Sequence, residues 1–254
     1  GRTTNTLTIE GGTTGAKVTL SNVNIDAPGA AVSVSGNVEL VITGTNILRS
    51  GENRAGLEKA DDDGTLTIDG TGSLEAYGGN EAAGIGSRAN NNVRNIVING
   101  GTITAECTGR DGAGIGGGQE STGQTTVTIK DGTIKEAVGG NIGDGIGGGK
   151  ESSGATNIEI TGDALVSAGS SGSAAIGSGE SSTGETTINI HDTNPEKGVK
   201  SAFAYGGAGI GSGRYAKGKT YVTISNASVS TLETPAASTN TSGAGIGTGY
   251  GSQS

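Results

Sequence analysis

Apolar residues recur along this chain in two short phrases that keep the same period. The first is an alternating tripeptide such as Ile96–Ile98, in which every second side chain is apolar, as in a strand with one buried face. The second is a glycine-rich phrase of the type Ala-Gly-Ile-Gly, whose isoleucines recur every 30 to 36 residues. Two independent phrases with one period predict the stacked coils of a solenoid. The isoleucines of the second phrase are Ile85, Ile115, Ile146, Ile176, Ile210 and Ile246.

Each coil is expected to hold three short strands. The alternating tripeptide supplies the first strand, a segment such as Gly101–Ala105 the second, and the Ala-Gly-Ile-Gly phrase the third. Such short strands are stable only when like strands of successive coils pair in parallel, about 4.8 Å apart. We therefore expect an all-β solenoid of about eight coils of 22–36 residues. The closing isoleucines of the first strands should form one interior ladder, made of Ile68, Ile98, Ile129, Ile160, Ile190 and Ile224.

The repeats indicate one domain over residues 1–254. Residues 1–57 hold coils with short loops, and residues 58–254 hold coils with longer loops after the Ala-Gly-Ile-Gly phrase. The stretch Asp192–Lys200, which contains Pro195, is expected to be a surface excursion between the first and second strands of its coil. Because the chain stops directly after such a phrase without an amphipathic cap, we expect neighbouring domains of a longer protein beside it.

Composition removes several alternatives. Glycine accounts for 52 of the 254 residues and proline for 3, without the three-residue period of collagen. No helix is predicted after the glycine phrase, so we interpret the phrase as a sharp corner of the coil rather than a phosphate-binding loop. One cysteine and one histidine exclude a disulfide framework and a Cys-rich or His-rich metal centre. The net charge of −9 argues against nucleic acid, and no apolar stretch is long enough for membrane insertion.

The segment VTLSNVNIDAPGAAVSVSGNVELVITGTNILRSG (Val18–Gly51) and the recurring GAGIGGG phrase resemble carbohydrate-binding domains and adhesins of Gram-positive bacterial surface proteins. The coil itself is similar to the right-handed parallel β-helix of pectate-lyase-like proteins. The resemblance implies a right-handed parallel β-helix and an extracellular, cell-surface or wall-attached location. It also implies a polysaccharide or a host surface protein as partner, and calcium (Ca2+) as a candidate cofactor. It assigns no role to any individual residue.

Acidic residues in one loop are the best candidates for a metal site. Asp61, Asp62 and Asp63 follow closely after Glu58. Clustered carboxylates and loop carbonyls can supply the six to eight oxygens that calcium requires. The alternative is a solvated turn, which the sequence Asp-Asp-Asp-Gly also favours.

Candidate ligand-binding residues lie mainly in the loops after the Ala-Gly-Ile-Gly phrase. Glu120 and Glu151 occupy the same loop position in adjacent coils, where stacked carboxylates repel unless a cation or Lys150 lies between them. Aromatic rings offer flat faces to sugars, and most rings of this chain cluster near its carboxyl end beside basic residues. The alternative is that these rings only pack a loop or the end of the rod. The aromatic and basic edge comprises Tyr205, Arg214, Tyr215, Lys217, Tyr221 and Tyr250.

Catalytic residues are harder to assign. Asp111 and Asp144 are a conceivable carboxylate pair from neighbouring coils. However, Asp144 replaces an alanine of the repeat, so its side chain should point near the interior. His191 lacks the partners of a catalytic triad, and Cys107 is expected to be a small, partly buried residue.

We therefore expect a non-catalytic surface adhesin or binding module that presents loops on one edge of a rigid β-helix. One alternative is a polysaccharide lyase or glycoside hydrolase that acts in a groove along the helix. A second alternative is a structural spacer or stalk.

Overall fold

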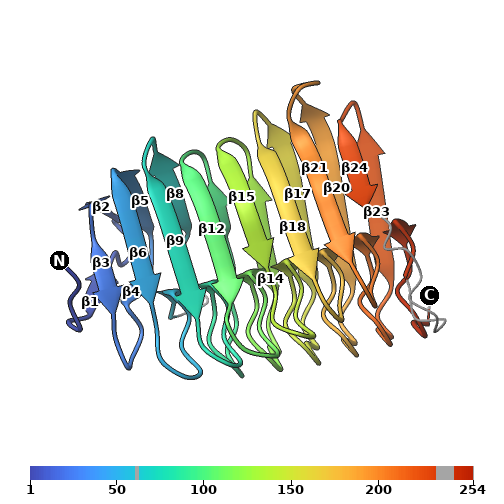
Figure 1. Ribbon diagram of the computed structural model, residues 1–254, viewed down its shortest axis with the longest axis horizontal. Coiled ribbons are helices and arrows are strands. Elements are labelled where there is room, and N and C mark those ends of the chain that lie inside the picture. Colours follow the sequence, from blue (N-terminus) through green and yellow to red (C-terminus); the bar gives the residue numbers. More distant parts are fainter. Residues whose placement is uncertain (61–62, 233–242, 254) are drawn as a thin grey trace.

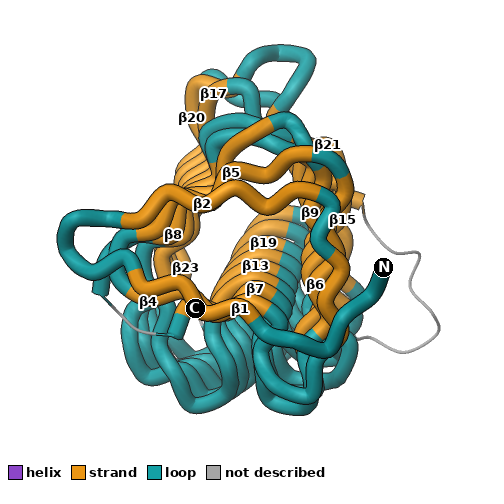
Figure 2. The backbone as a smooth tube through the Cα atoms, turned by 90° about the vertical axis from the view of Figure 1, so that its left-hand side faces the viewer, coloured by secondary structure: helices purple, strands orange, loops and turns teal. Residues whose placement is uncertain are grey.

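The computed structural model describes residues 1–60, 63–232 and 243–253. The regular elements of these residues are β-strands in three parallel sheets, which line an elongated rod (Figure 1). Successive strands belong to different sheets, so every three strands complete one coil. Seen from the amino-terminal end in Figure 2, the chain winds clockwise as it recedes, which makes the solenoid right-handed. None of the described residues forms a helix long and apolar enough to cross a membrane.

Each sheet collects the equivalent strand of every coil. Sheet 1 has nine strands, namely β1 (Leu7–Glu10), β4 (Val32–Ser35), β7 (Leu57–Lys59), β10 (Ile85–Gly86), β13 (Ile115–Gly116), β16 (Ile146–Gly147), β19 (Ile176–Gly177), β22 (Ile210–Gly211) and β25 (Ile246–Gly247). Sheet 2 has eight strands, namely β2 (Ala16–Ser21), β5 (Val38–Thr43), β8 (Leu66–Gly70), β11 (Ile96–Ile98), β14 (Thr125–Ile129), β17 (Thr156–Gly162), β20 (Thr186–Thr193) and β23 (Thr220–Ser225). Sheet 3 has eight strands, namely β3 (Asn24–Asp26), β6 (Thr45–Arg49), β9 (Ser73–Gly78), β12 (Thr102–Cys107), β15 (Thr133–Val138), β18 (Leu165–Ser170), β21 (Gly198–Ala204) and β24 (Val229–Leu232).

The predicted isoleucine ladders are confirmed in their register, but their last members, Ile224 and Ile246, are exposed rather than interior. In sheet 1, Ile115 pairs with Ile85 on one side and with Ile146 on the other, and all three side chains are fully buried. In sheet 2, Ile98 pairs with Ile129 in the same way. Each such side chain contributes about 1.5–3 kcal/mol when it is buried rather than exposed. Because its contacts lie in neighbouring coils, the stack of coils stabilises strands that would not persist alone.

Five strands of sheet 1 that carry the glycine-rich phrase, β10, β13, β16, β22 and β25, end at a glycine with a left-handed φ. Gly116 has a φ of 132° and Gly147 a φ of 137°, a conformation that residues with a side chain rarely adopt. A Cβ added at Gly116 would lie 2.1 Å from the carbonyl oxygen of Gly147. The glycine phrase is therefore a structural corner, as its sequence predicts.

The stretch Asp192–Lys200 departs from the prediction in its extent. β20 continues to Thr193 and β21 begins at Gly198, so only residues 194–197, including Pro195, leave the sheets. Both strand ends pair with the preceding coil. The added strand residues thus gain ladder hydrogen bonds, which a long surface excursion would have to replace with water.

Candidate functional site

The predicted aromatic and basic edge is divided in the structure. One part lies in the loops after β22 and β25, where the rings of Tyr215 and Tyr250 meet edge to face with their centroids 5.8 Å apart. The guanidinium carbon of Arg214 lies 5.2 Å from the centroid of Tyr215. Arg214 also pairs with the largely buried Glu180, with Nη2 at 2.6 Å and Nε at 3.0 Å from the same carboxylate oxygen. This part is a compact cluster whose arginine is already engaged.

The other members of the predicted edge lie elsewhere. Tyr221 is an exposed residue of β23 and pairs with Thr187 in sheet 2. Tyr205 follows β21 at the border of sheet 3, where its ring meets the ring of Phe203 edge to face at 4.8 Å. Lys217 belongs to the loop that leads to sheet 2, and its backbone N–H donates to Ser182. The rings that cluster in the sequence therefore face three different parts of the surface.

Glu120 and Glu151 share their loop position with Tyr215. All three residues have a left-handed φ between 55° and 57°, and each donates its backbone N–H to the carbonyl of the next coil. The carboxylate of Glu151 pairs with Lys150 at 3.1 Å, whereas that of Glu120 accepts a hydrogen bond from the side chain of Gln119. The row thus mixes carboxylates and a ring rather than forming a continuous acidic edge.

The residues proposed for calcium are only partly described. Glu58 is almost fully buried and pairs with Arg54 at 2.6 Å, and its second carboxylate oxygen accepts the N–H of Ala55. Burial raises the pKa of Glu58, although Arg54 opposes the shift. Asp61 and Asp62 lie outside the described residues, and the carbonyl oxygen of Asp63 accepts a hydrogen bond from Lys59. Among the described residues, no three His, Cys, Asp or Glu side chains are grouped so that they could hold a metal ion.

Asp144 and Cys107, two of the residues considered for catalysis, are buried. The carboxyl group of Asp144 is fully buried and accepts hydrogen bonds from Ser173, Ala174 and Gly148, so it does not face a substrate. The expectation that Asp144 points toward the interior is confirmed, and its carboxyl group is bonded to Ser173 rather than paired with Asp111 as a catalytic couple would be. Cys107 is buried, and burial raises the pKa of its thiol.

His191 is half-buried and lies between two carboxylates. Its ring nitrogens are 3.1 Å from Glu159 and 3.1 Å from Asp192. These hydrogen bonds raise the pKa of His191, with that from Asp192 contributing most. The arrangement is an exposed charge cluster on sheet 2 and lacks a nucleophile.

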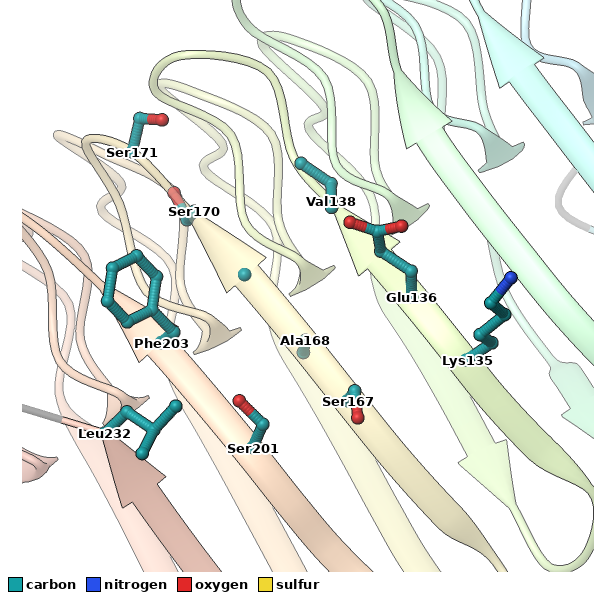
Figure 3. A pocket seen from close by; sticks show the side chains of 11 residues that line it. Lys135, Glu136, Val138, Ser167, Ala168, Ser170, Ser171, Ser201, Phe203 and Leu232 are labelled. Atoms are coloured by element: carbon teal, nitrogen blue, oxygen red, sulfur yellow. The ribbon is translucent and has the colours of Figure 1, made fainter.

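A groove on the outer face of sheet 3 is the clearest candidate site (Figure 3). It has a volume of about 430 Å³ and is centred on β18, between β15 and β21. Val138, Phe203 and Leu232 provide apolar walls. Polar groups come from both sides and from the floor, namely Lys135, Glu136, Ser167, Ser170, Ser171 and Ser201.

The groove exists because small residues face outward from β18. Its outward positions are Leu165, Ser167 and Gly169, of which the last two line the groove, and the neighbouring strands carry Val138 and Phe203 opposite Gly169. A Cβ added at Gly169 would meet only the carbonyl oxygen of Phe203, at 3.8 Å. Unlike Gly147, Gly169 is therefore not required by the backbone. Its missing side chain instead leaves open space between two ridges.

Two β-bulges shape the rims of the groove. In β15 the pairing register shifts between Ile134 and Ala137, so that Lys135 and Glu136 are both exposed. A similar shift in β21 leaves both Lys200 and Ser201 facing outward. Bulges re-aim side chains and are frequent next to functional sites. They place polar groups at the edge of an apolar depression.

One known protein family supports this architecture. A family described as Beta helix repeat matches residues 66–87, 96–119 and 127–150. The protein contains a parallel β-helix domain. The three matches fall on three successive coils, which hold strands β8 to β16. Searches among curated proteins and among solved structures returned no match.

Reasoning from the sequence missed the main elements of the groove. Phe203 was visible as one of six aromatic residues, but its outward position opposite Gly169 depends on the bulge in β21. The available signal was Gly169 itself, because a glycine interrupts the alternating second strand without a corner to explain it. The exposed Leu232 also lines the groove, but only the structure shows that this large apolar side chain faces outward.

Proposed function

We propose that this β-helix is a non-catalytic binding module for a polysaccharide and that the groove on sheet 3 is its binding site. The observation that carries the proposal is an outward depression with an aromatic wall, flanked by hydroxyl and carboxylate groups. A sugar ring has an apolar face and a rim of hydroxyls, so it needs both kinds of contact. Ligand sites generally combine an apolar surface with a few polar groups that fix orientation.

The rigidity of the groove supports this proposal. Phe203 is held by the edge-to-face contact with Tyr205, and its strand is paired on both sides with β18 and β24. A wall that is already ordered loses little side-chain entropy when a ligand binds. The loop cluster around Arg214 fits the role less well, because its guanidinium is already paired with Glu180.

The cellular setting is part of the same proposal. The resemblance to Gram-positive surface proteins favours an adhesin that works outside the cell, at the cell surface or attached to the wall. A host surface protein remains the other class of partner, and binding to protein rather than glycan would contradict the groove as a sugar site. Calcium dependence is measured by repeating each binding experiment with a chelator.

The test is a glycan array followed by calorimetry with three variants. Phe203→Ala removes the aromatic wall, and Gly169→Val fills the groove at a position where the backbone leaves room for a side chain. Each should weaken glycan binding about tenfold or more, because one good apolar contact is worth about 1.4 kcal/mol. Tyr221→Ala is the matched control, since it removes an exposed ring from sheet 2. Unchanged binding by Phe203→Ala and Gly169→Val would overturn the proposal.

One observation favours glycoside hydrolysis as the second candidate. Burial raises the pKa of Glu106, and the nearby carboxylate of Glu136 raises it further. A carboxyl group with a raised pKa beside a second carboxyl group is the arrangement that glycosidases use as acid and base. Release of new reducing ends from a bound polysaccharide, lost in Glu106→Gln, would establish hydrolysis and contradict the non-catalytic role. Glu10→Gln, which changes an exposed carboxylate on β1 of sheet 1, is the control.

A further inference from the structure

The groove is one end of a longer row of outward positions on sheet 3. The pairing register places Tyr77 of β9 opposite Glu106 of β12, and Glu106 opposite Val138 of β15. Val138 is opposite Gly169 of β18, and Gly169 is opposite Phe203 of β21. Tyr77 and Phe203 are thus the two rings of one row that runs along the rod. Four strand steps of about 4.8 Å separate them, which gives about 19 Å.

Tyr77 is held as firmly as Phe203. The guanidinium carbon of Arg49, its partner on β6, lies 4.9 Å from the ring centroid. The hydroxyl group of Tyr77 donates a hydrogen bond of 3.1 Å to Glu75. Burial and the carboxylate of Glu75 raise the pKa of Tyr77, so the phenol stays protonated and keeps this bond. The ring remains only half-buried, so part of it is accessible to a ligand.

The positions between the two rings suit a ligand that lies across the strands. Glu106 offers a partly buried carboxylate as an acceptor for hydroxyl groups. Val138 offers an apolar side chain, and Gly169 brings the ligand close to the backbone. A ligand that lies across the strands would therefore meet a hydrogen-bond acceptor at Glu106, an apolar side chain at Val138 and a depression at Gly169. A polymer that crosses the strands would meet all of them, whereas a short fragment in the groove would meet only the last two.

We propose that the ligand is a linear polysaccharide that lies along the rod axis and contacts both Phe203 and Tyr77. This inference rests on the proposed function of the groove. It makes Tyr77 a second binding platform, which only chains long enough to cross four strand steps can reach. Affinity should therefore keep rising with chain length after the groove itself is filled.

The experiment uses oligosaccharide series from disaccharide to octasaccharide, prepared from xylan, from mixed-linkage β-glucan and from polygalacturonate. In the wild type, affinity should increase with length until both rings are spanned. Tyr77→Ala should weaken the longest oligosaccharides about tenfold and leave the shortest unchanged, whereas Phe203→Ala should weaken all lengths. Tyr77→Phe keeps the ring and should bind as the wild type does. If Tyr77→Ala loses its thermal transition, Tyr77→Thr replaces it, because threonine favours strands.

The possible results distinguish a failure of the axial arrangement from a failure of the groove as a sugar site. If affinity stops rising at short chains and Tyr77→Ala behaves as the wild type, the axial arrangement is wrong while the groove remains a sugar site. If no series binds the wild type, the proposed function itself fails. A protein partner captured through Phe203, with no glycan binding, would also overturn both proposals.

Discussion

Replacing Asp144 with alanine should make the stability of the rod less sensitive to alkaline pH. The carboxyl group is fully buried, and Oδ1 accepts hydrogen bonds from the hydroxyl of Ser173 at 2.6 Å and from the N–H of Ala174 at 3.1 Å. Oδ2 accepts the N–H of Gly148 at 3.1 Å. Burial raises the pKa of Asp144 well above its ordinary value, although these donors act in the opposite direction.

The sign of the pH effect follows from this raised pKa. Between the ordinary pKa of 3.8 and the higher folded-state pKa, the folded chain keeps the proton of Asp144 and the unfolded chain releases it. The stability that protonated Asp144 contributes is therefore fully present below the ordinary pKa. It is lost as the pH rises through the folded-state pKa. Within this window the free energy of unfolding falls by at most about 1.4 kcal/mol per pH unit, because one proton is involved.

Alanine fits this position because other coils already contain it. In the preceding coil, the N–H of Ala113 donates to the carbonyl four residues later, at 2.9 Å. The N–H of Ala174 donates to Asp144 instead, and without the carboxylate it can turn to the carbonyl of Ser178. The loss at acidic pH should then be limited to the hydrogen bond from Ser173, about 1 kcal/mol.

The assay is guanidinium unfolding followed by circular dichroism at intervals from about pH 4 to about pH 9. We expect Asp144→Ala to be about 1 kcal/mol less stable than the wild type near the acidic limit, and more stable than the wild type near the alkaline limit. Glu185→Ala, which removes an exposed carboxylate, should follow the wild type throughout. Parallel pH profiles for the wild type and Asp144→Ala would refute the reasoning, because they would show that burial does not shift this group.

Three further predictions test the architecture. Gly147→Ala should destabilise the rod by several kcal/mol or prevent folding, because the added Cβ would lie 2.0 Å from the carbonyl oxygen of Gly177. Gly169→Ala should be close to neutral, and thermal melting of the two variants compares them directly. Ile146→Ala should cost about 2–5 kcal/mol in denaturant unfolding, since it opens a cavity in a fully buried ladder, and a cost under about 1 kcal/mol would contradict the ladder as a stabilising unit. Cys107 should react slowly with a thiol reagent in the folded protein and rapidly after unfolding, because its thiol is buried and its pKa is raised; equal rates would contradict its burial.

Much of the candidate site depended on pairing that no local pattern reveals. The clustering of Tyr205, Tyr215 and Tyr221 in the sequence suggested one patch, but the coil carries these rings to a sheet 3 border, a loop and sheet 2. Conversely, Tyr77 and Phe203 are far apart in the chain and share one row. A coil of about 30 residues separates positions that lie about 4.8 Å apart, so small shifts in loop length decide which side chains meet.

The sequence by itself determined the architecture of this protein. Its two periodic phrases specify three strands per coil, the ladders of Ile85 and Ile98, and the glycine corner of the coils from β10 onward, because each of these depends on alternation and spacing that recur along the chain. The groove was decided by tertiary structure alone. It arises from Gly169, whose missing side chain the backbone does not require, from bulges on two neighbouring strands, and from a register that only stacked coils establish. Periodicity encodes what every coil shares, whereas the site lies where three adjacent coils differ.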